Sequence, residues 1–409
     1  MTSSLTPVLT SPGWELLQRW ENHSERQSIS SIDLGKALRS AGVSTDTVTG
    51  ILTQLSLRDE AERKFGEFAR HMIFTRDGLE QATRMIVAAR HAQRFRDAGT
   101  TCIADLGCGI GGDALAFAGL GLKVIAIDRD EDAANATAVN LRAFDDSDVR
   151  LADVTELSIP DLVTEGVDGL FADPARRTGA SHGSARRLSP HQWSPPLPTI
   201  LSWRDYCEAL GVKLAPGIGH SHLPADCHVQ WTSVDGDLVE AALWTPPLAP
   251  EGAGRSALVF HGTTAHLLSD EDVHAANAPI RQAEVQPLGQ MIAEPDPAVI
   301  RSGMVAQLAD TLGAGLVSPS IAYLTGDDLP KTPFATRFEV LDTTALRPKA
   351  INAALKALNI GRIEVKKRGA DIQPATFRKS LKLLGEEEAT LFATRIQGRH
   401  KAVIARRVV

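Results

Sequence analysis

A glycine-rich loop, followed by an acid at the end of the next apolar stretch, is the first sign of chemistry in this sequence. The loop is Asp105-Leu-Gly-Cys-Gly-Ile-Gly-Gly112, and the acid is Asp128, directly after Lys123-Val-Ile-Ala-Ile127. A strand, a glycine loop, a helix and a second strand ending in an acid are typical of a nucleoside-cofactor site. Asp128 is placed to accept both ribose hydroxyls. The backbone can approach the ligand where no Cβ atom intervenes, at Gly107, Gly109 and Gly111.

The identity of the cofactor depends on Asp105 rather than on the glycines. The spacing of Gly107, Gly109 and Gly112 also fits a dinucleotide fingerprint, so an NAD(P)-dependent oxidoreductase stays open. A carboxylate two residues before the first glycine suits a cationic amino-acid tail, which S-adenosylmethionine carries. Asp153, after an expected third strand, is placed to accept from the adenine amino group, although aspartate is also common in strand-end turns. We therefore predict an S-adenosylmethionine site made of Asp105, Gly107, Gly109, Gly111, Asp128 and Asp153.

A further acid stands where methyl transfer would take place. The apolar run Val167-Asp-Gly-Leu-Phe-Ala172 ends in Asp173-Pro174-Ala175-Arg176, and many methyltransferases carry an acid-Pro pair at the tip of the fourth strand. Methyl transfer from a sulfonium is a direct displacement, so positioning supplies much of the rate. We expect Asp173 and the Pro174 carbonyl to orient the nucleophile, and Arg176 to stack on a base or clamp a phosphate. The alternative is an ordinary strand-ending turn.

The elements that must position these residues alternate between strand and helix. A hairpin is expected at Asp235-Gly236, between the last two of seven predicted strands. Five parallel strands closed by a hairpin are typical of class I methyltransferases, whereas dinucleotide-binding folds normally end in another crossover helix. The predicted fold class is therefore α/β with a Rossmann-like sheet. Its strands are expected near 102–106, 123–127, 149–152, 167–172, 211–215, 227–233 and 238–244, with helices at 112–119 and 131–143.

Two regions flank this sheet. Residues 1–98 are predicted to be helical, with a helix over 77–94 that leads into the first strand. An edge strand is expected at 256–260, and a C-terminal α/β module follows. That module is predicted to contain helices at 297–312, 348–358 and 374–384 and strands at 336–342, 362–367, 389–396 and 400–408.

The composition is that of an ordinary globular protein of two or three domains, with 43% apolar and 23% charged residues in a chain of 409. The four cysteines lack CxxC spacing, so we expect reduced thiols in a cytoplasmic protein. No apolar run reaches the roughly 18 residues of a membrane span, and residues 1–6 lack a basic stretch followed by an apolar one, so we expect neither a membrane span nor a secretory signal. His220 and His222 lack the further ligands that a zinc site needs, so no metal is expected.

The net charge of −7 conceals a basic C-terminal region. Residues 347–409 hold 15 Lys and Arg against 5 Asp and Glu, whereas the rest of the chain holds 28 against 45. Such a region suits a polyanion partner, although a solvated lysine-rich face would have the same composition. Lys366, Lys367 and Arg368 follow one another at the end of an expected strand. We predict that they bind RNA through its backbone and shape.

The motifs Asp105-Leu-Gly-Cys-Gly-Ile-Gly-Gly-Asp113 and Asp173-Pro-Ala-Arg-Arg177 together resemble a bacterial family of class I methyltransferases with a C-terminal THUMP-like domain. The segments 74–83, 365–369 and 394–398 are also similar to that family. The resemblance covers roughly residues 60–409. It implies a Rossmann-like S-adenosylmethionine-binding domain 99–282, a small ferredoxin-like segment 283–335 and a basic THUMP-like domain 336–409, which follow the helical region 1–98 predicted above.

This resemblance implies an RNA substrate, because THUMP domains generally bind structured RNA. Ala175 and Arg176 stand where better understood relatives have a second proline and an aromatic residue, so the methylated atom stays open. The sequence thus predicts an S-adenosylmethionine-dependent methyltransferase that acts on RNA. An NAD(P)-dependent oxidoreductase and a non-catalytic RNA-binding protein with a degenerate cofactor fold are the alternatives. A small phosphorylated metabolite is a further candidate substrate.

Overall fold

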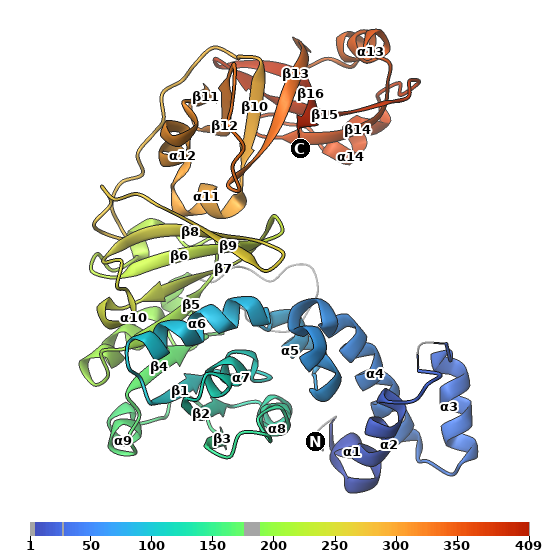
Figure 1. Cartoon of the computed structure of the whole chain (residues 1–409), viewed down its shortest axis with the longest axis vertical. Helices are drawn as coiled ribbons and strands as arrows, with labels where there is room; N and C mark the ends of the chain where they lie inside the picture. Colours follow the sequence, from blue (N-terminus) through green and yellow to red (C-terminus); the bar gives the residue numbers. More distant parts are fainter. Residues whose placement is uncertain (1–4, 27, 176–188, 409) are drawn as a thin grey trace. The chain divides into compact units, whose positions relative to one another are not determined.

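The computed structural model describes all residues except 1–4, 27, 176–188 and 409. It contains one nine-stranded and one seven-stranded sheet (Figure 1). The chain divides into two compact units. The first unit comprises Met1–Ala215 and Ala242–Glu251, and the second comprises Pro216–Ala241 and Gly252–Val409. No helix among the described residues combines the length and the apolar character needed to cross a membrane.

The nine-stranded sheet has the order β3-β2-β1-β4-β5-β7-β6-β8-β9. Its first five strands run parallel, and the turn Asp235-Gly236 returns the chain from β6 to β7 with positive φ at both residues. The strands are β1 (Cys102–Leu106), β2 (Lys123–Asp128), β3 (Ser147–Leu151), β4 (Gly169–Ala172), β5 (Leu210–Leu214), β6 (His228–Val234), β7 (Asp237–Trp244), β8 (Gly254–His261) and β9 (Thr264–Ser269). The seven predicted strands and the hairpin are therefore present. The strand predicted at 256–260 is β8, but it is not an edge strand, because β9, which was not predicted, pairs with it on the outer side.

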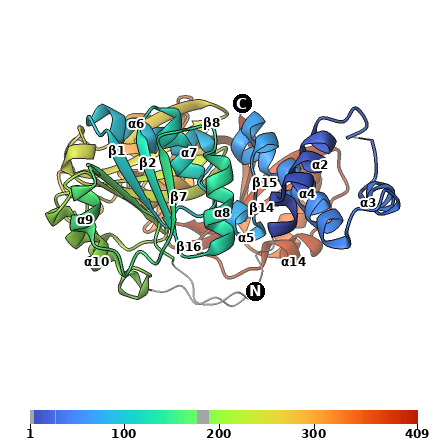
Figure 2. The same cartoon turned by 90° about the horizontal axis from the view of Figure 1, so that it is seen from below.

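The strand order brings two functional segments together. Because β1 is followed in space by β2 on one side and β4 on the other, the carboxyl ends of β1 and β4 flank the crevice where open α/β sheets bind ligands. Four helices cover this part of the sheet: α7 (Gly112–Gly119), α8 (Glu131–Asn140), α9 (Ile159–Thr164) and α10 (Leu197–Ser202). Figure 2 shows α7 and α8 on one face and α9 and α10 on the other.

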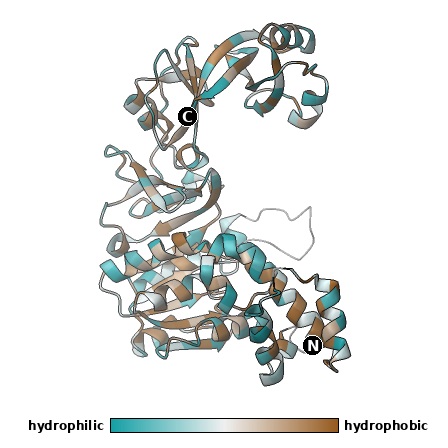
Figure 3. Cartoon of the chain, turned by 45° about the vertical axis from the view of Figure 1, so that its right-hand side comes forward, coloured by the Kyte–Doolittle hydropathy of each residue, from teal (hydrophilic) through white to brown (hydrophobic). Residues whose placement is uncertain are grey.

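A cluster of aromatic rings fastens helices to the sheet in the first unit. Phe95, Phe117 and Phe171 meet edge to face, with ring centroids 5.5–6.4 Å apart, and Trp244 stacks on Phe171 at 6.2 Å. All four residues are buried, and the strands around them form the apolar interior coloured brown in Figure 3. Such ring pairs contribute roughly 0.5–1.5 kcal/mol each beyond their buried area.

The N-terminal helices are α1 (Thr6–Leu9), α2 (Ser11–Glu21), α3 (Ser31–Ser40), α4 (Thr45–Phe65), α5 (Arg76–Gln81) and α6 (Met85–Asp97), with a 3-10 turn at Gly66–His71. The single helix predicted over 77–94 is therefore wrong, because α5 and α6 are separate. Lys64 of α4 explains the break. Its Nζ donates to the carbonyls of Leu79, Glu80 and Ala82 at 2.7–3.0 Å, which ends α5 by satisfying its last carbonyl groups.

Two buried amide side chains hold the segment before α5. Gln54 of α4 exchanges two hydrogen bonds with the backbone of Phe74, at 2.7 and 3.0 Å. Asn140 of α8 accepts from the N–H of Ile73 at 2.7 Å and donates to the carbonyls of Ile73 and Ile110 at 3.1 and 2.8 Å. Since Ile110 belongs to the glycine loop, Asn140 joins the N-terminal region directly to that loop.

The seven-stranded sheet lies in the second unit and has the order β11-β12-β10-β13-β16-β15-β14. Neighbouring strands are antiparallel except β14 and β15, which are parallel. The strands are β10 (Met291–Pro295), β11 (Gly315–Ser318), β12 (Ile321–Gly326), β13 (Ala335–Ala345), β14 (Ile360–Lys367), β15 (Glu387–Ile396) and β16 (Arg399–Val408). The sequence predicted β13 to β16 but not β10 to β12. The division into four parts remains a prediction.

The helices of this unit are α11 (Pro297–Ser302), α12 (Val305–Leu312), α13 (Pro348–Ala357) and α14 (Pro374–Lys379). The helix predicted over 297–312 is in fact two helices, because Gly303 has a left-handed φ of +80° and ends α11. The helix predicted over 374–384 ends earlier, at Lys379.

We predict that Asn140→Ala lowers the free energy of unfolding by about 2 kcal/mol, because it leaves buried backbone groups of Ile73 and Ile110 without partners. The same change should weaken cofactor binding by loosening the glycine loop. Thermal unfolding with and without the cofactor measures both effects. Asn22→Ala, an exposed helix-end substitution, is the control. Unfolding and binding equal to the wild type in Asn140→Ala would contradict this role.

Candidate functional site

The glycine loop begins with a close approach between two strands. Gly107 has φ of +89°, and a Cβ atom there would lie 2.8 Å from the carbonyl oxygen of Asp173. The N–H groups of Gly107 and Cys108 donate to the carbonyl of Ile127 at 2.9 and 3.1 Å. Any larger residue at position 107 would push the tip of β4 away from β1, so the glycine is required for packing as well as for conformation.

The rest of the loop is fixed by Asp128 and Thr137. Asp128 Oδ2 accepts from the N–H of Gly109 at 2.8 Å, and the Thr137 hydroxyl donates to the Gly109 carbonyl at 2.8 Å. Gly111 has φ of +80°, and a Cβ atom there would lie 3.0 Å from Thr137. Burial raises the pKa of Asp128, while hydrogen bonds from the N–H groups of Asp130 and Gly109 oppose that rise. Asp128 thus stands at the tip of β2 beside the loop.

Asp105 is the most unusual side chain of this region. It is only 1% exposed, and its Oδ2 has no hydrogen-bond partner among the described residues. Burial raises its pKa well above the ordinary value, and the charges of Asp113 and Asp173 raise it further. A buried carboxyl oxygen without a donor is costly. Asp105 therefore fits a ligand that brings a cationic donor, such as the ammonium group of S-adenosylmethionine.

Asp153 lies in a turn after β3. Its Oδ1 accepts from the N–H and the hydroxyl of Thr155 at 2.9 and 2.7 Å, and its Oδ2 lies 3.5 Å from Arg129. The hydrogen bonds from Thr155 lower the pKa of Asp153. The aspartate thus forms the strand-end turn considered from the sequence, and its contact with adenine stays a prediction.

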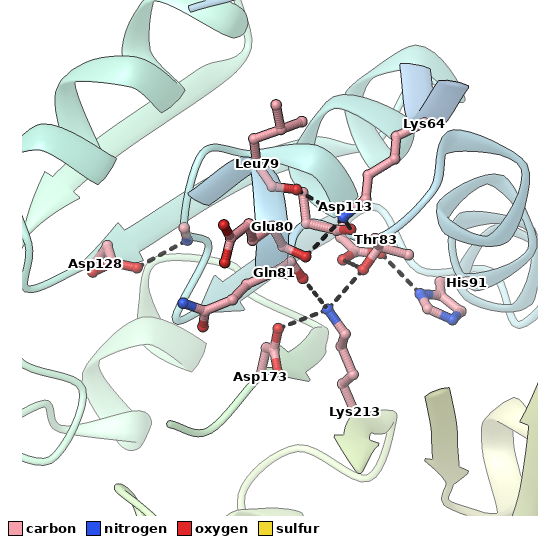
Figure 4. A network of polar contacts seen from close by, with 12 residues as sticks. Lys64, Leu79, Glu80, Gln81, Thr83, His91, Asp113, Asp128, Asp173 and Lys213 are labelled. Atoms are coloured by element: carbon pink, nitrogen blue, oxygen red, sulfur yellow. Dashed lines mark hydrogen bonds and ion pairs between the residues drawn. The ribbon is translucent and has the colours of Figure 1, made fainter. Parts of the chain in front are cut away.

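Asp173 is held by a lysine that the sequence analysis did not single out. Its N–H donates to the carbonyl of Leu106 at 3.1 Å, and its Oδ2 accepts from Lys213 Nζ at 2.8 Å. Lys213 also donates to the hydroxyl of Thr83 at 2.9 Å and lies 3.4 Å from the carbonyl of Gln81 (Figure 4). The side chain of Asp173 is 25% exposed, and that of Lys213 only 6%.

The contacts continue from Thr83 to a buried acid and a histidine. The Thr83 hydroxyl donates to Asp113 Oδ2 at 2.6 Å, and His91 Nδ1 lies 2.8 Å from Asp113 Oδ1. Burial opposes ionisation of Asp113, but the hydrogen bond of His91 and the charges of His91 and Lys213 outweigh it, so its pKa is lowered. Burial, together with the charge of Lys213, lowers the pKa of Lys64 to about 8. Figure 4 shows this network from Asp173 to His91.

The structure brings Asp105, Asp128 and Asp173 to neighbouring strand tips, as the sequence predicted. Pro174 is buried, and Ala175 exchanges two backbone hydrogen bonds with Ser194, at 2.9 and 3.0 Å. Arg176 lies outside the described residues. A signal in the sequence could have revealed Lys213, because it is a charged residue within the apolar run Leu210-Gly-Val-Lys-Leu214. This run forms the fully buried strand β5. Thr83 and His91 carried no such signal.

The three cations predicted to bind RNA do not share one surface. Lys366 Nζ lies 2.6 Å from Glu294, and Arg368 lies 3.4 Å from the same carboxylate, with its guanidinium 5.0 Å from the ring centre of Tyr323. Lys367 is exposed and alternates to the opposite face of β14. Lys367 pairs with Ala393 of β15, so the two side chains lie on the same face of the sheet. Exposed Arg395, two residues after Ala393, lies on that face as well.

Within the described part of the chain, no three or more His, Cys, Asp or Glu side chains gather in a way that could hold a metal ion. His220 accounts for one of the two histidines noted in the sequence, since its Nε2 lies 2.8 Å from the carbonyl of Arg301.

The sheet order, the glycine loop after β1 and the acid at the tip of β2 define a Rossmann-like methyltransferase of class I. A family described as THUMP domain-like matches residues 335–407. A protein from Porphyromonas gingivalis W83, proposed to be a methyltransferase, has the same fold, with a TM-score of 0.74 and 19% identity over 96% of this chain and 98% of its own.

Two relatives from Mycobacterium tuberculosis, of strains H37Rv and CDC 1551, are named as uncharacterized S-adenosylmethionine-dependent methyltransferases. Each is 31% identical over 349 residues, which cover 83% of this chain and 90% of the relative. The chain belongs to this family of S-adenosylmethionine-dependent methyltransferases. It is therefore an enzyme, and S-adenosylmethionine is its cofactor, which leaves the NAD(P)-dependent and non-catalytic alternatives without support.

We predict that the affinity for S-adenosylmethionine rises as pH increases through the raised pKa of Asp105. The ionised carboxylate accepts from the ammonium group, whereas at lower pH a proton competes with the ligand. Titration calorimetry over a pH series measures this dependence. Asp105→Asn should bind S-adenosylmethionine more weakly and lose this pH dependence. Asp145→Asn, at an exposed turn, should keep the pH dependence. An unchanged pH dependence in Asp105→Asn would remove Asp105 from cofactor binding.

Proposed function

We propose that this enzyme methylates RNA, with Asp173 and the Pro174 carbonyl orienting the accepting atom. The observation that carries this proposal is the position of Asp173. Its backbone is bonded to Leu106, beside the glycine loop, and its partly exposed carboxylate is fixed by Lys213 at 2.8 Å. In the same proposal, Gly107, Gly109, Gly111, Asp128 and Asp153 hold the nucleoside of the cofactor, and Asp105 holds its amine.

The reaction needs orientation more than acid–base chemistry. The bound cofactor supplies an activated methyl group whose leaving sulfur requires no proton. The protein must then hold the nucleophile in line, which a carboxylate does by accepting a hydrogen bond from an N–H or O–H of the substrate. A carboxylate fixed beside the tip of β1 suits this task, and it can take the proton that the nucleophile loses.

RNA as the substrate is supported by the C-terminal region. The THUMP domain-like match at 335–407 coincides with the basic region 347–409, which has 15 cationic against 5 acidic residues. Neutralising phosphates releases counterions, which favours binding of a polyanion to such a region. Lys367 and Arg395 are the exposed pair that suits this contact, whereas Lys366 and Arg368 already face Glu294. A cytoplasmic location belongs to the same proposal, and none of the four cysteines forms a disulfide.

The test is incubation with radiolabelled S-adenosylmethionine and total RNA from a strain that lacks the protein. We predict that the wild type labels one RNA class and that Asp173→Ala abolishes labelling while cofactor affinity stays near normal. Asp161→Ala, on the short helix α9 away from the strand tips, is the control. Labelling by Asp173→Ala at the wild-type rate would exclude its role. Label in a small phosphorylated metabolite instead of RNA would exclude the RNA substrate.

A second prediction concerns the basic surface. The double variant Lys367→Ala/Arg395→Ala should bind a structured RNA hairpin more weakly and with a shallower salt dependence, by about one logarithmic unit of slope per lost phosphate contact. Fluorescence anisotropy over a salt series measures the slope. Arg362→Ala is the matched control, because Arg362 lies on the same strand but pairs with Glu388 at 2.5 Å. A slope unchanged in the double variant would contradict this assignment.

A further inference from the structure

Lys213 is the feature of the first unit that the proposed function does not yet use. It is a buried lysine on β5, the strand beside β4, and its Nζ contacts Asp173, Thr83 and Gln81. An ammonium group has three protons, and each of these three groups can accept one of them. A cation held on several sides loses the freedom that a lysine side chain ordinarily has.

The acceptors of Lys213 are themselves fixed. Thr83 donates its hydroxyl proton to Asp113 at 2.6 Å, so its lone pairs point toward Lys213. Asp113 is kept ionised by His91 at 2.8 Å. The position of Gln81 is set by α5, whose Gly78 packs so tightly on Ile110 that a Cβ atom would lie 2.3 Å from that side chain. The ammonium group is therefore held from α5, α6 and α7 at once.

We propose that Lys213 is a positioning residue for methyl transfer, which fixes the carboxylate of Asp173 in the orientation that receives the substrate. This inference rests on the proposed role of Asp173. Lys213 acts through Asp173 and not on the cofactor, since its side chain is only 6% exposed and its Nζ contacts Asp173, Thr83 and Gln81. A displacement of about 1 Å in a positioned group can reduce a rate about 100-fold.

The charge of Lys213 separates this role from a merely structural one. Asp105, Asp113, Asp128 and Asp173 surround the cofactor end of the sheet, and Lys213 opposes their charge. S-adenosylmethionine carries one more positive charge than the product S-adenosylhomocysteine. At a pH above the raised pKa of Asp105, where this carboxylate is ionised in both proteins, removal of the lysine charge therefore leaves S-adenosylmethionine affinity equal or higher while turnover falls. Loss of structure would instead weaken both.

The experiment compares Lys213→Met and Lys213→Arg with the wild type. Calorimetry gives the affinities for S-adenosylmethionine and S-adenosylhomocysteine, and labelling of total RNA from a strain that lacks the protein gives turnover. We expect Lys213→Met to lose about 10–100-fold in labelling, with S-adenosylmethionine bound at least as tightly as by the wild type. Lys213→Arg should recover part of the loss. Lys123→Met, an exposed lysine at the amino end of β2, is the matched control.

A double-variant cycle with Asp173→Asn provides an independent measure. If Lys213 acts through Asp173, adding Lys213→Met to Asp173→Asn reduces labelling little further. Additive losses would overturn the inference, as would wild-type labelling by Lys213→Met, or a joint loss of affinity and turnover.

If Lys213→Met does not fold, the variants Lys213→Arg and Thr83→Val test the same role of Lys213. Wild-type turnover in both of them would overturn the inference. A wild type that labels no RNA refutes the proposed function, and this inference with it.

Discussion

Charge compensation within a buried site is the constraint on which this structure depends. Asp105, Asp113 and Asp173 interact electrostatically at the carboxyl end of the sheet, and Asp105 and Asp113 are almost completely buried. Carboxylates in such surroundings cannot all stay ionised without cations or donors. Lys213 and His91 supply part of the positive charge that compensates these carboxylates. The carboxyl group that is left without such compensation is that of Asp105. The acid whose Oδ2 has no donor among the described residues is thus the one at the amino-acid end expected for a cationic cofactor.

The same constraint explains why the N-terminal region adjoins the catalytic sheet. Gln81, the last residue of α5, and Thr83, which follows before α6 begins, supply acceptors for Lys213. A continuous helix through this segment would use the Gln81 carbonyl in its own hydrogen bonding. Lys64 ends α5 from α4, so a residue distant in the sequence from the glycine loop determines the geometry beside it.

The sequence was sufficient for the elements whose signals are local. The glycine loop, the acids at strand tips and the alternation of apolar runs predicted β1 to β8 and the positions of Asp105, Asp128 and Asp173. It was insufficient where a distant side chain decides the backbone, as Lys64 does between α5 and α6. Of the short strands β10 to β12, β10 pairs with β13, β12 with β10 and β11 with β12, and no local pattern records this pairing. The pairing of Lys366 and Arg368 with Glu294 is equally non-local.

The buried amides of Gln54 and Asn140 have a consequence for how far this chain can be shortened. A protein beginning at residue 99 would have an Asn140 amide without the Ile73 backbone as its partner, and a Lys213 ammonium group without Thr83. Such a truncation would therefore remove groups that position the crevice itself. The helices before β1 and the strands β1 to β5 form one structural unit.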